Sequence, residues 1–175
     1  MARMAHRGSK LGRIWRHLWL DESDTRKAIP RELAERLKDR VAASEQRHTG
    51  QVRICVEAAL PLSYLWRNET PRQRAVTMFG KLRVWDTEHN NGVLIYLLLA
   101  ERAIEIVADR GLARHVAPHE WHAIVERMRS ALREGRFEDG LTQALEEVSA
   151  LLVERFPAQA GEGNPNELPD APVLR

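Results

Sequence analysis

Oxygen-bearing side chains gather in the segment 84–91, directly before a glycine and eight consecutive apolar residues. Asp86, Glu88 and Asn90 alternate along this segment, and Asn91 ends it. Carboxylate and amide oxygens are the ligands that the hard cations Ca²⁺ and Mg²⁺ prefer. The pattern therefore indicates a candidate site for Ca²⁺ or Mg²⁺, although it lacks the closing glutamate of an EF-hand loop.

The same residues also have a structural interpretation. Asp86 or Thr87 can cap the turn, and Asn90 or Asn91 can hydrogen-bond the backbone where the apolar segment begins. Asn and Gly tolerate positive φ, so an Asn-Gly pair can turn the chain directly into a sheet. The sequence leaves three interpretations of this corner open: a cation site, a structural turn, and contact with another ligand or a protein.

Other chemistries lack their characteristic spacing. His119 and His122 are three residues apart, whereas a zincin helix places two histidines four apart with a glutamate after the first. The chain contains no Gly-x-Ser-x-Gly, no Gly-rich phosphate loop and no dinucleotide fingerprint. Cys55, the single cysteine, lies in an apolar run and is predicted to be a small buried core residue.

Composition is typical of one soluble globular domain. The 175 residues are 43% hydrophobic and 30% charged, with a formal net charge of +2. Beyond the N-terminal arm the cations are interspersed with acids, so we predict no nucleic-acid partner. No segment has the length of a transmembrane helix, and the N-terminus lacks the apolar stretch of a secretory signal. These features predict a cytoplasmic protein, with a membrane-peripheral location as the alternative.

Hydrophobic periodicity and turn residues predict an alternation of helices and strands. The predicted helices cover residues 30–48, 118–133 and 141–156, with a further one beginning at Pro71, and the predicted strands cover 51–59, 92–100 and 103–108. Val76, Phe79 and Leu82 are predicted to form the buried side of the helix that begins at Pro71, and 60–68 is predicted to be a loop. The order predicts an α/β fold, a three-layer α/β/α sandwich around a small mixed β-sheet.

Chain direction decides which residues share an edge of this sheet. The first two strands are joined through a helix and are predicted to be parallel, whereas the third returns through a tight hairpin and is antiparallel. Asp109, at the end of the third strand, should therefore lie beside the start of the second, while Glu57 should lie near the hairpin turn. The candidate cation ligands at the corner are Asp86, Glu88, Asn90, Asn91 and Asp109.

Two terminal segments flank the predicted domain 29–157. Residues 1–28 form a basic amphipathic arm, in which residues 11–20 mix Trp and Leu with cations. We expect a short helix that packs its Trp and Leu side on the domain and leaves its arginines in water. The alternative is peripheral contact of residues 11–20 with an anionic membrane surface. Residues 158–175 contain several prolines and glycines and little that could pack, so this tail is predicted to be disordered.

Three short motifs match a known family pattern. Asn90-Asn91-Gly92-Val93-Leu94 opens a hydrophobic strand, Thr49-Gly50-Gln51-Val52 enters the first strand, and Phe137-x-x-Gly140-Leu141 precedes the last helix. With the order of elements, these motifs resemble the TPM domain family over about residues 29–156. The resemblance implies an α/β/α sandwich around a small mixed sheet. Members of that family include proteins described as acid phosphatases or as binding calcium, and many are uncharacterised.

Two positions depart from the family pattern. Members commonly carry a glutamate in the third strand followed by Gly-x-Gly-Leu, where this chain has Val107 and then Asp109-Arg110-Gly111-Leu112. An aspartate is common before the next helix, where this chain has Ala117-Pro118. Because two acidic positions are lost, we expect a non-catalytic TPM-like module that contacts a protein partner, with residues 11–20 as a candidate membrane contact. The alternative is a phosphatase-like enzyme that uses Ca²⁺ or Mg²⁺.

Overall fold

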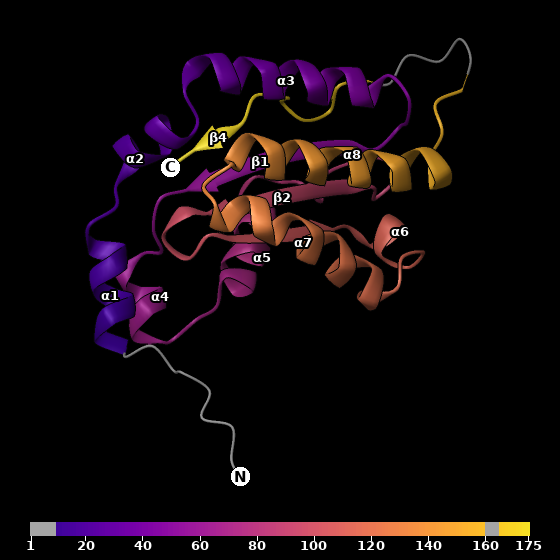
Figure 1. The fold of residues 1–175 in the computed structure, drawn as a ribbon. Coiled ribbons are helices and arrows are strands. Elements are labelled where there is room, and N and C mark those ends of the chain that lie inside the picture. Colours follow the sequence, from indigo (N-terminus) through magenta and orange to yellow (C-terminus); the bar gives the residue numbers. More distant parts are fainter. Residues whose placement is uncertain (1–9, 160–164) are drawn as a thin grey trace.

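The fold consists of a mixed sheet between two layers of helices (Figure 1). A computed structural model describes residues 10–159 and 165–175. Its elements are α1 (Lys10–Leu18), α2 (Glu22–Ala28), α3 (Arg31–Glu45), β1 (Gln51–Glu57), α4 (Leu62–Trp66), α5 (Pro71–Lys81), β2 (Gly92–Leu98), a 3₁₀ turn (Leu99–Glu101), β3 (Ala103–Ala108), α6 (Arg110–Ala113), α7 (Pro118–Arg133), α8 (Phe137–Arg155) and β4 (Val173–Leu174). The α/β sandwich predicted from the sequence is confirmed. Each helix within the described residues is too short or too polar to cross a bilayer.

The strand order of the sheet is β3-β2-β1-β4. β1 and β2 run parallel, from Gln51 opposite Gly92 to Glu57 opposite Leu98. β2 and β3 run antiparallel as the predicted hairpin, and Arg102 turns the chain between them with a φ of 47°. The predicted strand directions are therefore confirmed, and Glu57 lies at the hairpin end of the sheet.

Alternating side chains of the strands build one core on each face of the sheet. The side chains of Val52, Ile54 and Val56 belong to the core that contains the buried residues of α3, α7 and α8. Cys55 faces the other way, with Tyr96 of β2, into the layer that contains α4 and α5. Every residue of β1 and β2 is buried, because both faces of these strands are covered. The predicted burial of Cys55 is confirmed.

Two local predictions need correction in the segment between β1 and β2. Residues 60–68 were expected to form a loop, and they contain the short helix α4. Val76 was expected to lie on the buried side of α5 with Phe79 and Leu82, but its side chain is 51% exposed. The helix instead turns Arg74 inward, where its guanidinium meets a carboxylate of β1. The buried ion pair of Arg74 therefore decides which side of α5 faces the sheet, and the apolar periodicity does not.

The C-terminal segment packs on the sheet, so the prediction of a disordered tail is wrong for residues 165–175. β4 pairs parallel with β1 at the edge of the sheet. Leu168 is only 6% exposed, and the side-chain oxygen of Gln51 accepts hydrogen bonds from the backbone N–H groups of Glu167 and Leu168. Backbone hydrogen bonds and one buried leucine order the segment, and neither is visible in its composition. Residues 160–164 of the predicted tail and 1–9 of the predicted arm lie outside the described residues.

Candidate functional site

The corner predicted from chain direction is present in the backbone. The N–H of Asp109 donates to the carbonyl of Gly92 at 2.8 Å, and the N–H of Gly111 donates to the carbonyl of Asn90 at 2.8 Å. A Cβ added at Gly111 would lie 2.4 Å from the carbonyl oxygen of Asn90, and one at Gly92 would lie 1.9 Å from that of Val84. The close approach of three backbone segments therefore requires glycine at both positions.

The outer predicted ligands do not turn toward one another. Asp86 accepts a hydrogen bond from Arg83 at 2.6 Å, and both side chains are exposed. Glu88 and Asn90 are also exposed, and the backbone N–H of Glu88 donates to the carboxylate of Glu167. Within residues 10–159 and 165–175, no group of three or more His, Cys, Asp or Glu side chains is placed to hold a metal ion.

Asn91 and Asp109, the inner predicted ligands, are both buried. The Asn91 backbone N–H donates to the Thr87 hydroxyl at 3.1 Å, and its side-chain amide donates to the Thr49 hydroxyl at 3.3 Å. Asp109 Oδ1 accepts from the N–H of Arg110 at 2.6 Å and caps α6. Asn91 Oδ1 and Asp109 Oδ2 are buried without a hydrogen-bond partner among the described residues. The corner thus combines a structural turn with two unsatisfied acceptor oxygens.

A buried ionic cluster on the α4–α5 side of the sheet was not predicted from the sequence. Glu57 accepts two hydrogen bonds from Arg74, at 2.8 and 2.6 Å, and one from the Tyr96 hydroxyl at 2.7 Å. The Arg74 guanidinium also lies 4.9 Å from the ring centroid of Tyr64. Burial and the neighbouring Glu57 carboxylate raise the pKa of Tyr96, so its phenol remains protonated. With the Glu57 carboxylate fully engaged, this cluster fixes α5 on the sheet.

The cluster has a weak signal in the sequence. Glu57 belongs to the alternation of β1, on the same side of the strand as Cys55. A carboxylate at a buried strand position requires a cation nearby, because an unpaired buried charge is strongly unfavourable. The strand pattern alone, however, does not identify Arg74 as that cation.

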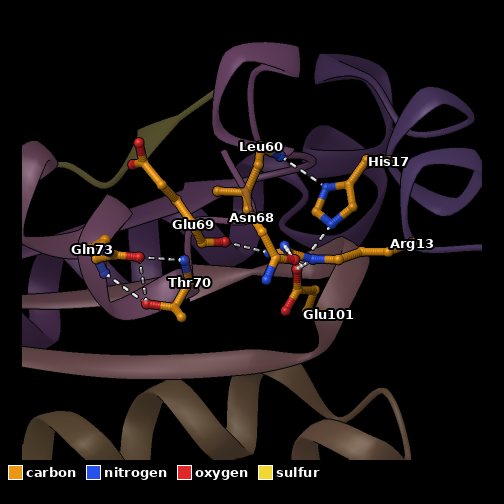
Figure 2. Close-up of polar contacts among 8 residues, drawn as sticks. All are labelled: Arg13, His17, Leu60, Asn68, Glu69, Thr70, Gln73 and Glu101. Carbon is orange, nitrogen blue, oxygen red and sulfur yellow. Dashed lines mark hydrogen bonds and ion pairs between the residues drawn. The ribbon is translucent and has the colours of Figure 1, made fainter. Parts of the chain in front are cut away.

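Helix α1 binds the domain through its polar side (Figure 2). His17 Nδ1 accepts the backbone N–H of Leu60 at 2.9 Å, so the ring proton is assigned to Nε2, which lies 3.0 Å from Glu101. Arg13 donates to the same carboxylate at 2.8 Å and to the carbonyl of Glu69 at 2.6 Å. Burial alone would raise the pKa of Glu101, but the hydrogen bonds from His17 and Arg13 outweigh it and lower that pKa.

The apolar side of α1 consequently faces solvent, opposite to the orientation expected from the sequence. We call six exposed side chains the α1–α4 surface: Leu11, Trp15 and Leu18 of α1, Trp19 directly after it, and Leu62 and Trp66 of α4. Each is between 51% and 76% exposed. The rings of Trp15 and Trp19 stack with their centroids 6.4 Å apart, and α1 and α4 lie side by side at one end of the molecule (Figure 1). The expectation that the Trp and Leu side packs on the domain is therefore wrong.

The orientation of α1 is explained by polar groups of the domain that need hydrogen-bond partners. The backbone N–H of Leu60 and the carboxylate of Glu101 would lack these partners without His17 and Arg13. Of the apolar residues on α1, Ile14 is the one that packs against the core formed with α4 and α5. Polar satisfaction therefore sets the orientation of this short helix, and burial of its apolar side does not.

The arrangement of a parallel strand pair, a β-hairpin and helices on both faces defines a small α/β/α sandwich protein. A family model described as TPM domain matches residues 23–151, and the chain belongs to this family. The match begins in α2 and ends in α8, so α1 and β4 lie outside it.

Two solved structures have a similar fold. The chain is similar to the BA42 protein of the psychrophilic bacterium Bizionia argentinensis, with 23% identity and a TM-score of 0.68 over 79% of this chain and 90% of that one. It is also similar to the N-terminal domain of a protein from P. gingivalis, with 17% identity and a TM-score of 0.58 over 71% of this chain and 78% of that one. No curated protein matches the chain.

Proposed function

We propose that this TPM-domain chain is a non-catalytic interaction module that contacts its partner, a protein or a membrane, through the α1–α4 surface. The observation that carries the proposal is the orientation of α1: its Trp15 stacks on Trp19, the residue after the helix, and the two are 60% and 76% exposed. A helix that only completed the domain would bury this side, because exposed contiguous apolar surface is unfavourable in water and marks interaction sites.

Rigid attachment of α1 supports the same conclusion. Arg13 and His17 hold the helix through Glu101 and through backbone groups next to α4. The helix is therefore already held against the domain, and a partner does not need to order its backbone. Preorganisation of this kind reduces the entropic cost of binding.

Site-specific photocrosslinking in the source cell tests this proposal for either class of partner. A photoreactive phenylalanine analogue in place of Trp15 should form adducts with a lipid or with a protein. The matched control carries the analogue in place of His122, an exposed residue of α7 in the opposite helical layer. Adducts that form equally at both positions, or at neither, would refute the α1–α4 surface as the contact.

A second candidate function is cation binding at the corner, with phosphatase-type chemistry. Asn91 Oδ1 and Asp109 Oδ2 support it, since buried oxygens without partners are commonly satisfied by an ion or a water molecule. Asp86, Glu88 and Asn90 lie close by in sequence and would have to turn inward to contribute. In this function the cation would activate water for attack on a phosphate ester.

Thermal unfolding with Ca²⁺ or Mg²⁺ tests the second candidate. Millimolar cation should raise the Tm of the wild-type chain by mass action, and the Asp109→Asn variant, which retains a capping oxygen, should lose the shift. The control is Asp139→Asn, which removes an exposed carboxylate already paired with Arg136 and outside the corner. An unchanged wild-type Tm, together with no cation-dependent hydrolysis of a phosphate ester, removes this function.

A further inference from the structure

We infer that the partner of the α1–α4 surface is an anionic lipid membrane. The inference rests on the proposed function and names the chemistry of its partner. It combines three observations on the described residues: the shape and composition of the apolar side, the distribution of charge over the molecule, and the repulsion that a second copy would meet.

The apolar side chains are suited to the boundary between lipid headgroups and acyl chains. Leu11, Trp15 and Leu18 follow the spacing of one helical face, and Trp19 stacks beside them. Trp66 of the neighbouring helix α4 is 76% exposed and supplies a third indole at this end of the molecule (Figure 1). Tryptophan is enriched at membrane interfaces because its ring is apolar while its N–H stays hydrated. A short amphipathic helix with Trp and Leu on one side and cations beside them is typical of interfacial binding.

Charge divides the two helical layers. The segments 10–18 and 62–81, which form α1, α4 and α5, contain seven Lys and Arg residues and one Glu. The segments 31–45 and 118–155, which form α3, α7 and α8 in the opposite layer, contain nine Lys and Arg residues and twelve Asp and Glu residues. Lys10, Arg16 and Arg67 are exposed next to the apolar side chains, where anionic headgroups would meet them.

The same charge distribution disfavours a second copy of the chain as the occupant. A symmetric dimer would place the same surface of two copies face to face. Lys10, Arg16 and Arg67 of one copy would then approach the same cations of the other, and like charges brought together oppose association. Anionic lipid supplies both the apolar environment and the opposite charge that this surface requires.

Vesicle flotation with the full chain tests the inference. Vesicles of phosphatidylcholine containing phosphatidylglycerol should carry the protein upward, whereas vesicles of phosphatidylcholine alone should carry at least several-fold less. High salt should weaken the binding, since headgroup attraction is screened within about 10 Å at 0.1 M salt. Bound protein should also show a blue shift of tryptophan emission, because the exposed indoles leave water.

Matched variants distinguish binding through the α1–α4 surface from nonspecific adsorption to vesicles. The double variant Trp15→Ser and Trp19→Ser should lose binding by roughly tenfold or more, since it removes the largest part of the inserted apolar area. The control is Trp85→Ser, which removes a 49% exposed indole near the start of β2, whereas α1 is attached to Glu101 just after the end of β2. Lys10→Glu serves as an additional charge variant. All four substituted positions, 10, 15, 19 and 85, are exposed, and unchanged urea unfolding verifies that each variant is folded.

The outcomes separate this inference from the proposed function. Equal flotation with both vesicle types, no flotation, or full binding by the Trp15→Ser and Trp19→Ser variant overturns anionic lipid bound through the α1–α4 surface as the partner. If vesicles fail while the analogue at position 15 crosslinks to a protein, the interaction module stands and its partner is that protein. If the analogue crosslinks to nothing and vesicles also fail, both are refuted.

Discussion

At the scale of single residues, Glu57 and Arg74 form an ion pair with side chains that are only 4% and 5% exposed. The hydroxyl of Tyr96 donates a third hydrogen bond to the same carboxylate. Desolvation of two charges is costly, and it is offset here by a bidentate geometry in which both carboxylate oxygens are engaged. Removal of one partner would leave the other charge buried without compensation.

The Glu57→Gln variant is therefore expected to lower the free energy of unfolding by about 3–5 kcal/mol. The matched control is Glu147→Gln, which breaks an equally short bidentate contact with Arg127 on the surface and should cost about 0–1 kcal/mol. Urea unfolding at neutral pH measures both values. Equal costs for the two variants would contradict the assignment of Glu57 as a buried anchor of α5.

At the scale of elements, apolar and polar patterning predicted most helices and strands, and it failed where a polar contact fixes the orientation. The strand 103–108 and the helix 118–133 were predicted at the observed bounds, because a hairpin turn and Pro118 define them. The helix that begins at Pro71 has the expected start, since Thr70 forms a capping box. The outward Trp side of α1 could not be predicted, because it depends on Leu60 and Glu101, which are distant in sequence.

The junction between α3 and β1 contains two titratable side chains with opposite effects on stability. Burial raises the pKa of Glu45 to about 7, although the N–H of Val52 donates to its carboxylate. Burial lowers the pKa of His48 to about 4. Glu45 therefore contributes stability that is complete below about pH 4.5 and is lost as the pH rises through 7. The contribution of His48 is complete above about pH 6.5 and is lost as the pH falls through 4.

The Glu45→Gln variant should change the pH dependence of unfolding in a defined direction. The two contributions oppose each other between about pH 4.5 and 6.5, so the wild-type profile should be shallow there. With Glu45 replaced, His48 alone remains and the free energy of unfolding should rise with pH, by up to about 3 kcal/mol. His48→Gln should give the reverse slope. Urea unfolding across this pH range provides the measurement, and superimposable profiles of wild type and Glu45→Gln would contradict the linkage.

At the scale of the whole molecule, the strand directions were predictable from the sequence, but the pairing of β4 with the edge of β1 was not. The sequence placed Asp109 beside the start of β2 because a hairpin must return its last residues there, and the backbone confirms this. The use of the corner side chains as cation ligands stays a prediction. β4 escaped prediction because its two residues gain their order from pairing with β1 and from Gln51, more than a hundred residues earlier.

The C-terminal segment is expected to be a structural part of the domain. Deletion of residues 165–175 would expose the edge of β1 and would remove the carbonyl groups of Pro169 and Ala171 that accept from Arg53. An uncovered edge strand also promotes aggregation.

The milder variant Leu168→Ala should lower the free energy of unfolding by about 2–3 kcal/mol, because Leu168 is 6% exposed. Its control is Val76→Ala at an exposed position, with an expected change of about 0.5 kcal/mol or less. Urea unfolding of all three chains distinguishes a packed segment from a dispensable tail, for which both the deletion and Leu168→Ala would leave the midpoint unchanged.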